Sequence, residues 1–231
     1  MKRSEINLLI DNAIDLLHEN QIRLPPFAYW SPEEWKKRGA ECNEIRDCKL
    51  GWDITDFGSH QFDRIGLVVF TVRNGHHSRA PYTGKPYAEK ILIVRENQHT
   101  PMHHHTLKSE DIICRSGGNL LIHLFNRGPD GGLADTDVDV SLDGVRCRVK
   151  AGQILRLKPG DSITLTPFLY HEFWTEQGTG TSIVGEVSSV NDDDSDNSFL
   201  VKVGRFPMIE EDVRATHLLC TEYDVQQAQS R

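Results

Sequence analysis

The chain has 231 residues, a formal net charge of −8 and a pI of about 5.7, and 38% of its residues are hydrophobic. This composition is typical of a globular protein and excludes collagenous, fibrous and extensively disordered classes. An acidic surface repels phosphate backbones, so nucleic acid is not an expected partner. Apolar stretches stay well short of the roughly 18 residues that span a bilayer. The N-terminal segment also lacks the apolar core of a signal peptide. We therefore expect a cytoplasmic protein without a membrane partner.

Helices are predicted in the first part of the chain. Residues 4–19 carry apolar side chains at helical spacing, with Ser4 as the expected N-cap. A Pro-Pro pair then prevents continuation. A second helix is expected to begin at Ser31, where a proline start and Glu34 form a capping box. We therefore predict residues 1–50 to be a helical extension.

From residue 51 onward the hydrophobic period changes from about four to two, which is typical of β-strands. The runs are not separated by helices long enough to connect parallel strands, so we expect an antiparallel sheet closed as a barrel or sandwich. Residues 51–231 should form this β-domain, in one structural unit with the helical extension, and the polar tail from 210 should be a short helix or a frayed end. The predicted strands are 52–57, 65–72, 88–95, 111–115, 119–125, 138–142, 145–149, 153–157, 162–165, 171–175, 183–187 and 199–203.

Three consecutive histidines followed by a glutamate indicate a metal site. In an extended strand, residues two apart point to one face, so His103 and His105 converge while His104 points away. Glu110 can return to the same point after a short turn. This donor set suits a divalent transition ion such as Mn²⁺, Fe²⁺, Co²⁺, Ni²⁺ or Zn²⁺, and His171 is the candidate for the fourth ligand. The alternative is a set of solvated loop histidines and a core histidine, but the combined spacing favours a metal.

The H-x-H-x4-E-x6-G pattern that starts at His103 resembles the first motif of the cupin superfamily, and the segment 152–171 resembles the second. Trp174 stands where the second motif usually has asparagine, a departure that leaves the metal ligands unchanged. The resemblance implies a mainly β fold, a cupin jelly-roll β-barrel that holds the metal inside, with the N-terminal helices packed outside.

Two further segments narrow the resemblance. Residues 88–93, Ala-Glu-Lys-Ile-Leu-Ile, and residues 185–199, a Gly-Glu-Val-Ser run with an Asn/Asp-rich tail, are similar to the D-lyxose isomerase family of cupins. Membership implies an aldose–ketose isomerase that uses one divalent cation, Mn²⁺ first, and acts on free sugars. The expected pairs are D-lyxose with D-xylulose and D-mannose with D-fructose. Homodimers are common among cupins, so a homodimer is expected by analogy.

The resemblance also gives roles to residues outside the metal motif. Lys90 leads a strand and is either an edge charge in water or, as we favour, a cation that stabilises a developing enediolate. Glu186 lies in an apolar strand, where a buried carboxylate with a raised pKa would suit general base catalysis; a solvated position is the alternative. Asp193 and Arg205 are expected to bind sugar hydroxyls, although Arg205 can equally be structural.

In this hypothesis Glu186 takes the C2 proton and returns it to C1 through an enediol, and Lys90 is an electrostatic or proton-shuttling partner. Which of the two is the base stays open, as does a hydride shift. One rival is a cupin dioxygenase with a three-His, one-Glu iron site, which would consume oxygen with Fe²⁺. Another is a non-catalytic sugar-binding cupin, which would bind ketose without turnover. The acidic loop 192–196 and the net charge disfavour phosphorylated sugars.

Overall fold

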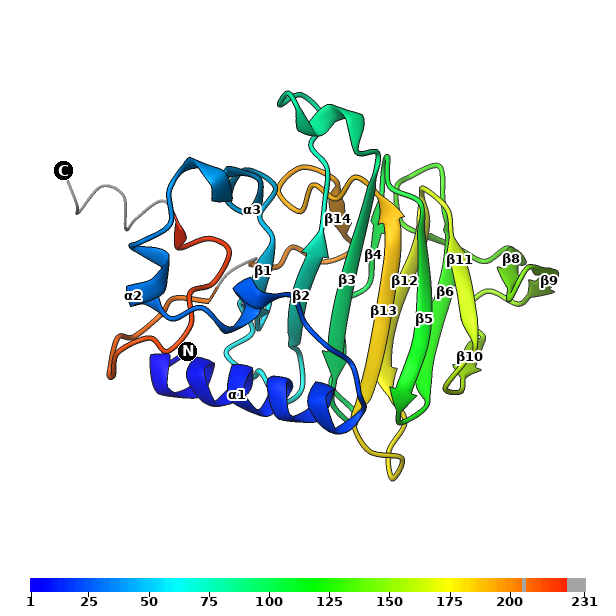
Figure 1. Ribbon diagram of the computed structural model, residues 1–231. Helices are drawn as coiled ribbons and strands as arrows, with labels where there is room; N and C mark the ends of the chain where they lie inside the picture. Colours follow the sequence, from blue (N-terminus) through cyan, green and yellow to red (C-terminus); the bar gives the residue numbers. More distant parts are fainter. Residues whose placement is uncertain (205–206, 224–231) are drawn as a thin grey trace.

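The architecture is known from a computed structural model that describes residues 1–204 and 207–223 (Figure 1). The helical elements are α1 (Arg3–Glu19), η1 (Pro26–Tyr29), α2 (Pro32–Trp35), η2 (Ala40–Cys42), α3 (Asn43–Asp47) and η3 (Tyr82–Gly84). The strands are β1 (Gly51–Thr55), β2 (Leu67–Arg73), β3 (Tyr87–Val94), β4 (His103–His105), β5 (Glu110–Gly117), β6 (Leu120–Arg127), β7 (Leu133–Ala134), β8 (Val138–Leu142), β9 (Val145–Val149), β10 (Ile154–Leu157), β11 (Ser162–Leu165), β12 (Leu169–Thr175), β13 (Ser182–Ser189) and β14 (Asn197–Phe199).

The strands form two antiparallel sheets. The larger sheet has the order β1-β2-β3-β13-β5-β11-β8-β9, and the smaller has the order β10-β6-β12-β4-β14 with β7 paired to β6. Their inner surfaces enclose an apolar core that includes Leu92, Ile112, Leu124 and Phe173. Two curled antiparallel sheets around one core form the jelly-roll arrangement, so the expected fold class is confirmed.

Helix α1 lies against the outer face of the larger sheet, beside β1 and β2 (Figure 1). Ile6, Ile10 and Leu17 share an apolar cluster with Trp52 and Phe70. The helical period therefore places one stripe of α1 on the sheet, as predicted.

The caps of the two predicted helices have different outcomes. Ser4 as N-cap is wrong, because the N-cap is Lys2 and its side chain makes no capping hydrogen bond. Ser4 lies in the first turn, and its N–H and Oγ donate to Asp212 at 2.9 and 2.6 Å, so a distant carboxylate takes the place of a local cap. The capping box of Ser31 and Glu34 is confirmed, although α2 ends after one turn.

The predicted strand 199–203 is wrong in all but its first residue. Strand β14 pairs with β4 only, in a register that runs from Asn197 opposite His105 to Phe199 opposite His103. Because β4 is three residues long, the pairing ends soon after Phe199, with one further bond from the N–H of Leu200 to the carbonyl of Met102 at 2.9 Å.

The C-terminal segment packs along α1 instead of fraying. Arg3 binds the carboxylates of Glu211 and Glu222, with Nη2 at 2.6 Å from Glu211. Asn7 Nδ2 donates to the carbonyl of Arg214 at 2.8 Å. Residues 210–222 are irregular, and the end of the tail prediction, 224–231, lies outside the described residues. Within the ranges described, no helix combines the length and apolar character needed to cross a membrane.

Candidate active site

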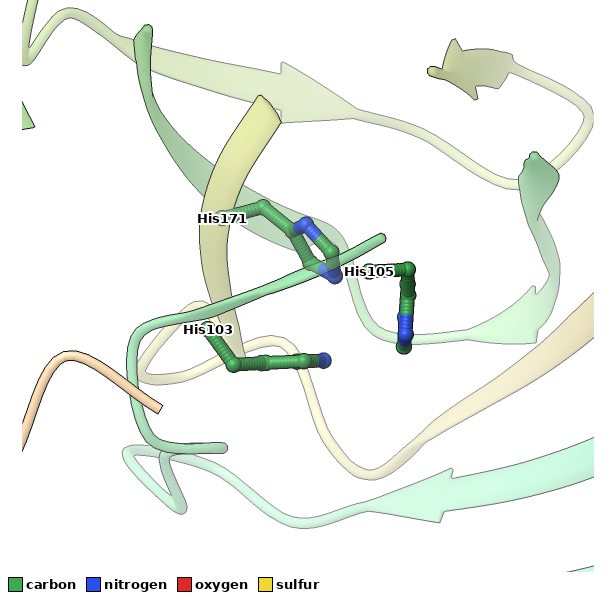
Figure 2. Close-up of side chains that lie close together, drawn as sticks. All are labelled: His103, His105 and His171. Carbon is green, nitrogen blue, oxygen red and sulfur yellow. The ribbon is translucent and has the colours of Figure 1, made fainter. Parts of the chain in front are cut away.

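The three histidines of the predicted metal site meet inside the barrel. His171 on β12 lies directly opposite His103 on β4. Candidate ligand atoms of His103, His105 and His171 lie within 4.8 Å of one another, and Figure 2 shows the three side chains close together. His104 is buried on the other side of β4, where its ring packs at 4.7 Å from that of Tyr170. The period of two in the strand explains this division.

Backbone carbonyls set the tautomers of two of these rings. The Nδ1–H of His103 donates to the carbonyl of Pro101 at 2.8 Å, and that of His171 donates to Leu169 at 3.0 Å. Each Nε2 is therefore left with a free lone pair. Burial lowers the pKa of His103 well below its usual value, and the neighbouring histidines lower it further. Burial also lowers the pKa of His105, with Lys108 contributing. Neutral imidazoles are the form that binds metal.

Glu110 completes a donor set around the same point. Its Oε1 lies 3.4 Å from His105 Nε2 and 3.1 Å from His171 Nε2. Because the proton of His171 is on Nδ1, its Nε2 and the carboxylate are both acceptors, and this Nε2 has no hydrogen-bond partner in the described chain. A cation between such groups would satisfy both. The residues therefore fit a divalent metal ion.

Lys108 contacts both Glu110 and Glu186 and so connects the candidate metal ligands to the other charged groups of the site. It was not predicted from the sequence. The ammonium Nζ lies 2.7 Å from Glu110 Oε2 and 2.8 Å from Glu186 Oε1, with the side chain almost fully buried. Burial alone would lower the pKa of Lys108, but the carboxylates of Glu110, Glu186 and Asp193 raise it far above its usual value. Burial would raise the pKa of Glu110, yet Lys108 holds it well below the usual range. Both groups are therefore charged at neutral pH.

The two predicted catalytic residues lie opposite each other on neighbouring strands. Lys90 on β3 pairs with Glu186 on β13, and both side chains are buried. Lys90 Nζ lies 3.6 Å from Glu186 Oε1 and 3.5 Å from Asp193 Oδ1. The structure therefore brings Lys90, Glu186 and Asp193 together. Arg205 lies outside the described residues.

The charged groups line a small cavity inside the barrel. Phe57, Phe173 and Phe199 form apolar parts of its wall. A larger cavity of about 280 Å³ lies next to it and shares Asp53 and Asp193 with it. The inner cavity measures about 60 Å³, and residues 191–194 of the acidic loop line the larger one.

Asp196 fixes the turn between the histidines and Glu110. Its Oδ1 accepts hydrogen bonds from the backbone N–H groups of Thr106 and Leu107 at 2.9 and 2.7 Å, and its Oδ2 accepts one from Lys108 at 2.9 Å. In sequence, Asp196 is one of several acids in a loop, so nothing distinguished it. Lys108, by contrast, stands two residues before Glu110, and that spacing was an available signal.

Comparison with known proteins places the chain in a class and then in a family. Its fold is similar to that of L-ribose isomerases from Cellulomonas parahominis, with a TM-score of 0.59 and 15% identity, and Geodermatophilus obscurus, with 0.60 and 18%. Each alignment covers 91% of this chain and 98% of the other. The model of the D-lyxose isomerase family matches residues 1–223.

Two curated relatives are much more similar in sequence. The D-lyxose/D-mannose isomerases of Escherichia coli O157:H7 and Serratia proteamaculans are each 50% identical over 224 residues, which cover 96% of this chain and 98% of theirs. The chain belongs to the D-lyxose isomerase family. It is an aldose–ketose isomerase, which decides against the dioxygenase and the non-catalytic binding protein.

Proposed function

We propose that this chain is a metal-dependent isomerase that interconverts free D-lyxose with D-xylulose and D-mannose with D-fructose through an enediol. The observation that carries the proposal is the buried row of charged side chains from Glu110 through Lys108 to Glu186, beside the cluster of three histidines. The names of the two relatives that are 50% identical support the choice of sugars.

His103, His105, Glu110 and His171 would hold one divalent cation. Mn²⁺ is our first choice, and Co²⁺, Fe²⁺, Ni²⁺ and Zn²⁺ also suit imidazole and carboxylate donors. When bound, such an ion supplies Lewis acidity that polarises a carbonyl and an adjacent hydroxyl.

Glu186 is the proposed base. It takes the proton from C2 and returns it to C1, while the hydroxyl proton moves from O2 to O1, so that only positions change. Lys108 stays protonated because its pKa is raised, which makes it unsuitable as a base. Lys90 is placed to stabilise negative charge on the enediolate. Asp193 and Arg205 would bind sugar hydroxyls, and the larger cavity would be the route of entry.

A homodimer, by analogy with other cupins, and a cytoplasmic location are also part of the proposal. Sedimentation analysis of the purified chain measures the oligomeric state directly.

The test is a panel of free pentoses, hexoses and mannose 6-phosphate, with ketose measured before and after chelation of metal. We expect turnover of D-lyxose or D-mannose that is lost with the metal and restored by Mn²⁺, and little turnover of the phosphate ester. Run in deuterated solvent, the product should carry label. Undiminished turnover by the metal-free chain would contradict metal dependence, and a persistent absence of label would favour a hydride shift.

The ligand set has its own matched pair of variants. His171→Ala should lose the ion and the activity, because the apolar core of the barrel does not depend on this side chain. His104→Ala should keep stoichiometric metal, since its ring faces Tyr170. Elemental analysis that finds the same metal content in His171→Ala as in the wild type would remove His171 from the ligand set.

A further inference from the structure

Asn191 follows strand β13 at the start of the acidic loop, and its side chain contacts both buried lysines. Its Oδ1 accepts a hydrogen bond from Lys90 Nζ at 2.6 Å and another from Lys108 Nζ at 3.4 Å. One amide oxygen has two lone pairs, so a single asparagine can accept from both ammonium groups. Asn191 is therefore the group that links the two cations facing Glu186.

Asn74 fixes the backbone at Asn191 from the end of strand β2. Asn74 Nδ2 donates to the carbonyl of Asn191 at 2.9 Å, and the N–H of Asn191 donates to Asn74 Oδ1 at 3.0 Å. Asn74 is buried, and its amide also donates to the carbonyl of Cys48 at 3.3 Å. These reciprocal bonds hold the loop to a strand that is remote in sequence.

The position of Lys90 depends on this arrangement. At 3.6 Å from Glu186 and 3.5 Å from Asp193, its Nζ is at or beyond ordinary hydrogen-bond distance from both carboxylates. The bond of 2.6 Å to Asn191 is shorter than either contact. A buried ammonium must satisfy its three donors, so removal of this acceptor would let Lys90 turn toward the carboxylates.

We propose that Asn191 is a positioning residue for the isomerase reaction, which holds Lys90 and Lys108 in place against Glu186, and that Asn74 acts by holding Asn191. The inference rests on the proposed function. A displacement of about 1 Å in a catalytic group lowers the rate by up to about a hundredfold, so the effect belongs in kcat and not in sugar binding.

The first test compares two variants of Asn191. Asn191→Leu keeps the size of the side chain but removes its acceptor oxygen, whereas Asn191→Asp keeps both the size and an acceptor oxygen. We expect kcat of the Leu variant to fall by about tenfold to a hundredfold, with a KM change of less than about threefold and unchanged metal content. The Asp variant should recover most of kcat. Asn126→Leu, near the end of β6, is the matched control and should behave as the wild type, because the amide of Asn126 donates to Thr136 and to the carbonyl of Asp137 and not to the groups of the site. If Asn191→Leu does not fold, Asn191→Ala replaces it.

The second test is a double-mutant cycle. Asn74→Ala should lower kcat less than Asn191→Leu does, and should add nothing in the Asn191→Leu background, because it acts through the same residue. Additive losses would overturn the role assigned to Asn74.

A third readout does not require turnover. Reductive methylation by formaldehyde and borane, followed by peptide mass spectrometry, measures how readily Lys90 reacts in the metal-free chain. We expect several-fold faster labelling of Lys90 in Asn191→Leu than in the wild type or Asn126→Leu. If the wild type fails to isomerise D-lyxose and D-mannose, the proposed function fails while the labelling still tests the contact. Unchanged kcat with unchanged labelling, or an Asp variant no better than the Leu variant, would overturn the inference.

Discussion

At the scale of single residues, the site consists of buried charged side chains, each of which is stabilised by neighbours of opposite charge. Burial of an unpaired ion costs several kcal/mol, yet Glu110, Glu186 and both lysines are buried. Among the described residues of the cavity, Lys90 and Lys108 face the carboxylates of Glu110, Glu186 and Asp193. The carboxylates outnumber the ammonium groups, so the site is electrostatically suited to a divalent cation.

Glu186→Gln keeps the shape and removes the basicity of the proposed base. We expect kcat to fall by about a hundredfold or more, the usual contribution of a general base, with metal content unchanged. Deuterium exchange at C2 of D-lyxose should fall with it. Glu89→Gln is the control, because Glu89 lies on the adjacent strand in a half-exposed ion pair with Arg73. Turnover by Glu186→Gln close to that of the wild type would exclude Glu186 from the mechanism.

As the pH falls, the metal-free chain should begin to lose stability at a higher pH than titration of its carboxylates alone would produce. The pKa values of His103 and His105 are lowered in the folded state, so below about pH 6.5 the unfolded chain binds more protons than the folded chain. The free energy of unfolding therefore falls as the pH drops through that point. The depressed pKa of Glu110 adds a further loss below about pH 4.5.

Thermal unfolding of the metal-free protein at a series of pH values measures this effect. The Tm should fall between about pH 7 and about pH 5, and less steeply in His103→Gln, which lacks one of the imidazoles. The pKa of Lys108 is raised in the folded state instead of lowered. Its contribution to the free energy of unfolding should therefore persist to pH values above the usual pKa of a lysine. A flat Tm across the acid range would show that these imidazoles are not buried neutral.

At the scale of elements, the site depends on a short strand between two remote segments. Strand β4 lies between β12 and β14, which place His171 and Asn197 beside the histidines. The turn that follows β4 has no ladder of its own and depends on Asp196. The acidic loop therefore shapes the site through one buried carboxylate as well as through Asp193.

Asp196→Ala should release that turn. Loss of three hydrogen bonds to a charged acceptor should lower the free energy of unfolding by about 2–4 kcal/mol, and weaken metal binding because Glu110 follows the turn. Asp194→Ala removes an acid from the same loop, but its exposed ion pair with Lys49 is worth little. Denaturant unfolding and metal titration of both variants check the difference; equal effects would mean that loop charge, not the anchored turn, is what matters.

The elements also show how far a sequence can be interpreted without a structure. Alternation alone located β3, β12 and β13, because a period of two is a local property, whereas the roles of Lys90 and Glu186 came from the family resemblance. Asp196 and Asn191 could not be found in this way, since their roles arise from contacts with Lys108 and Asn74 about a hundred residues away. Ser4 failed as a cap for the same reason.

At the scale of the whole molecule, the two ends of the described chain stabilise each other. The side chain of Arg3 is almost fully buried between Glu211, which is largely exposed, and Glu222. Helix α1, which carries Arg3, packs on the larger sheet, whereas β4 and β12, which carry the histidines, belong to the smaller sheet (Figure 1). A substitution of Arg3 should therefore change the free energy of unfolding without changing catalysis.

Arg3→Met should lower the free energy of unfolding by about 1–2 kcal/mol, less than for a fully buried pair because water can reach Glu211. The kcat and metal content should not change. Lys36→Met, which breaks an exposed ion pair with Glu33, is the control and should have almost no effect. Urea unfolding checks the stability; a large loss of activity at low temperature would show that α1 is coupled to the site.

The contacts between α1 and the C-terminal segment also set an order of events during protein synthesis. Arg3 and Glu211 are 208 residues apart. At about 5–20 residues per second, the ribosome adds Glu211 roughly 10 to 40 s after Arg3. Throughout that interval Arg3 has neither carboxylate partner, and the apolar stripe of α1 has no sheet until β1 and β2 have formed. The first helix to be made is thus among the last parts to be completed, and in a nascent chain stalled before residue 211 Arg3 would lack both of its carboxylate partners.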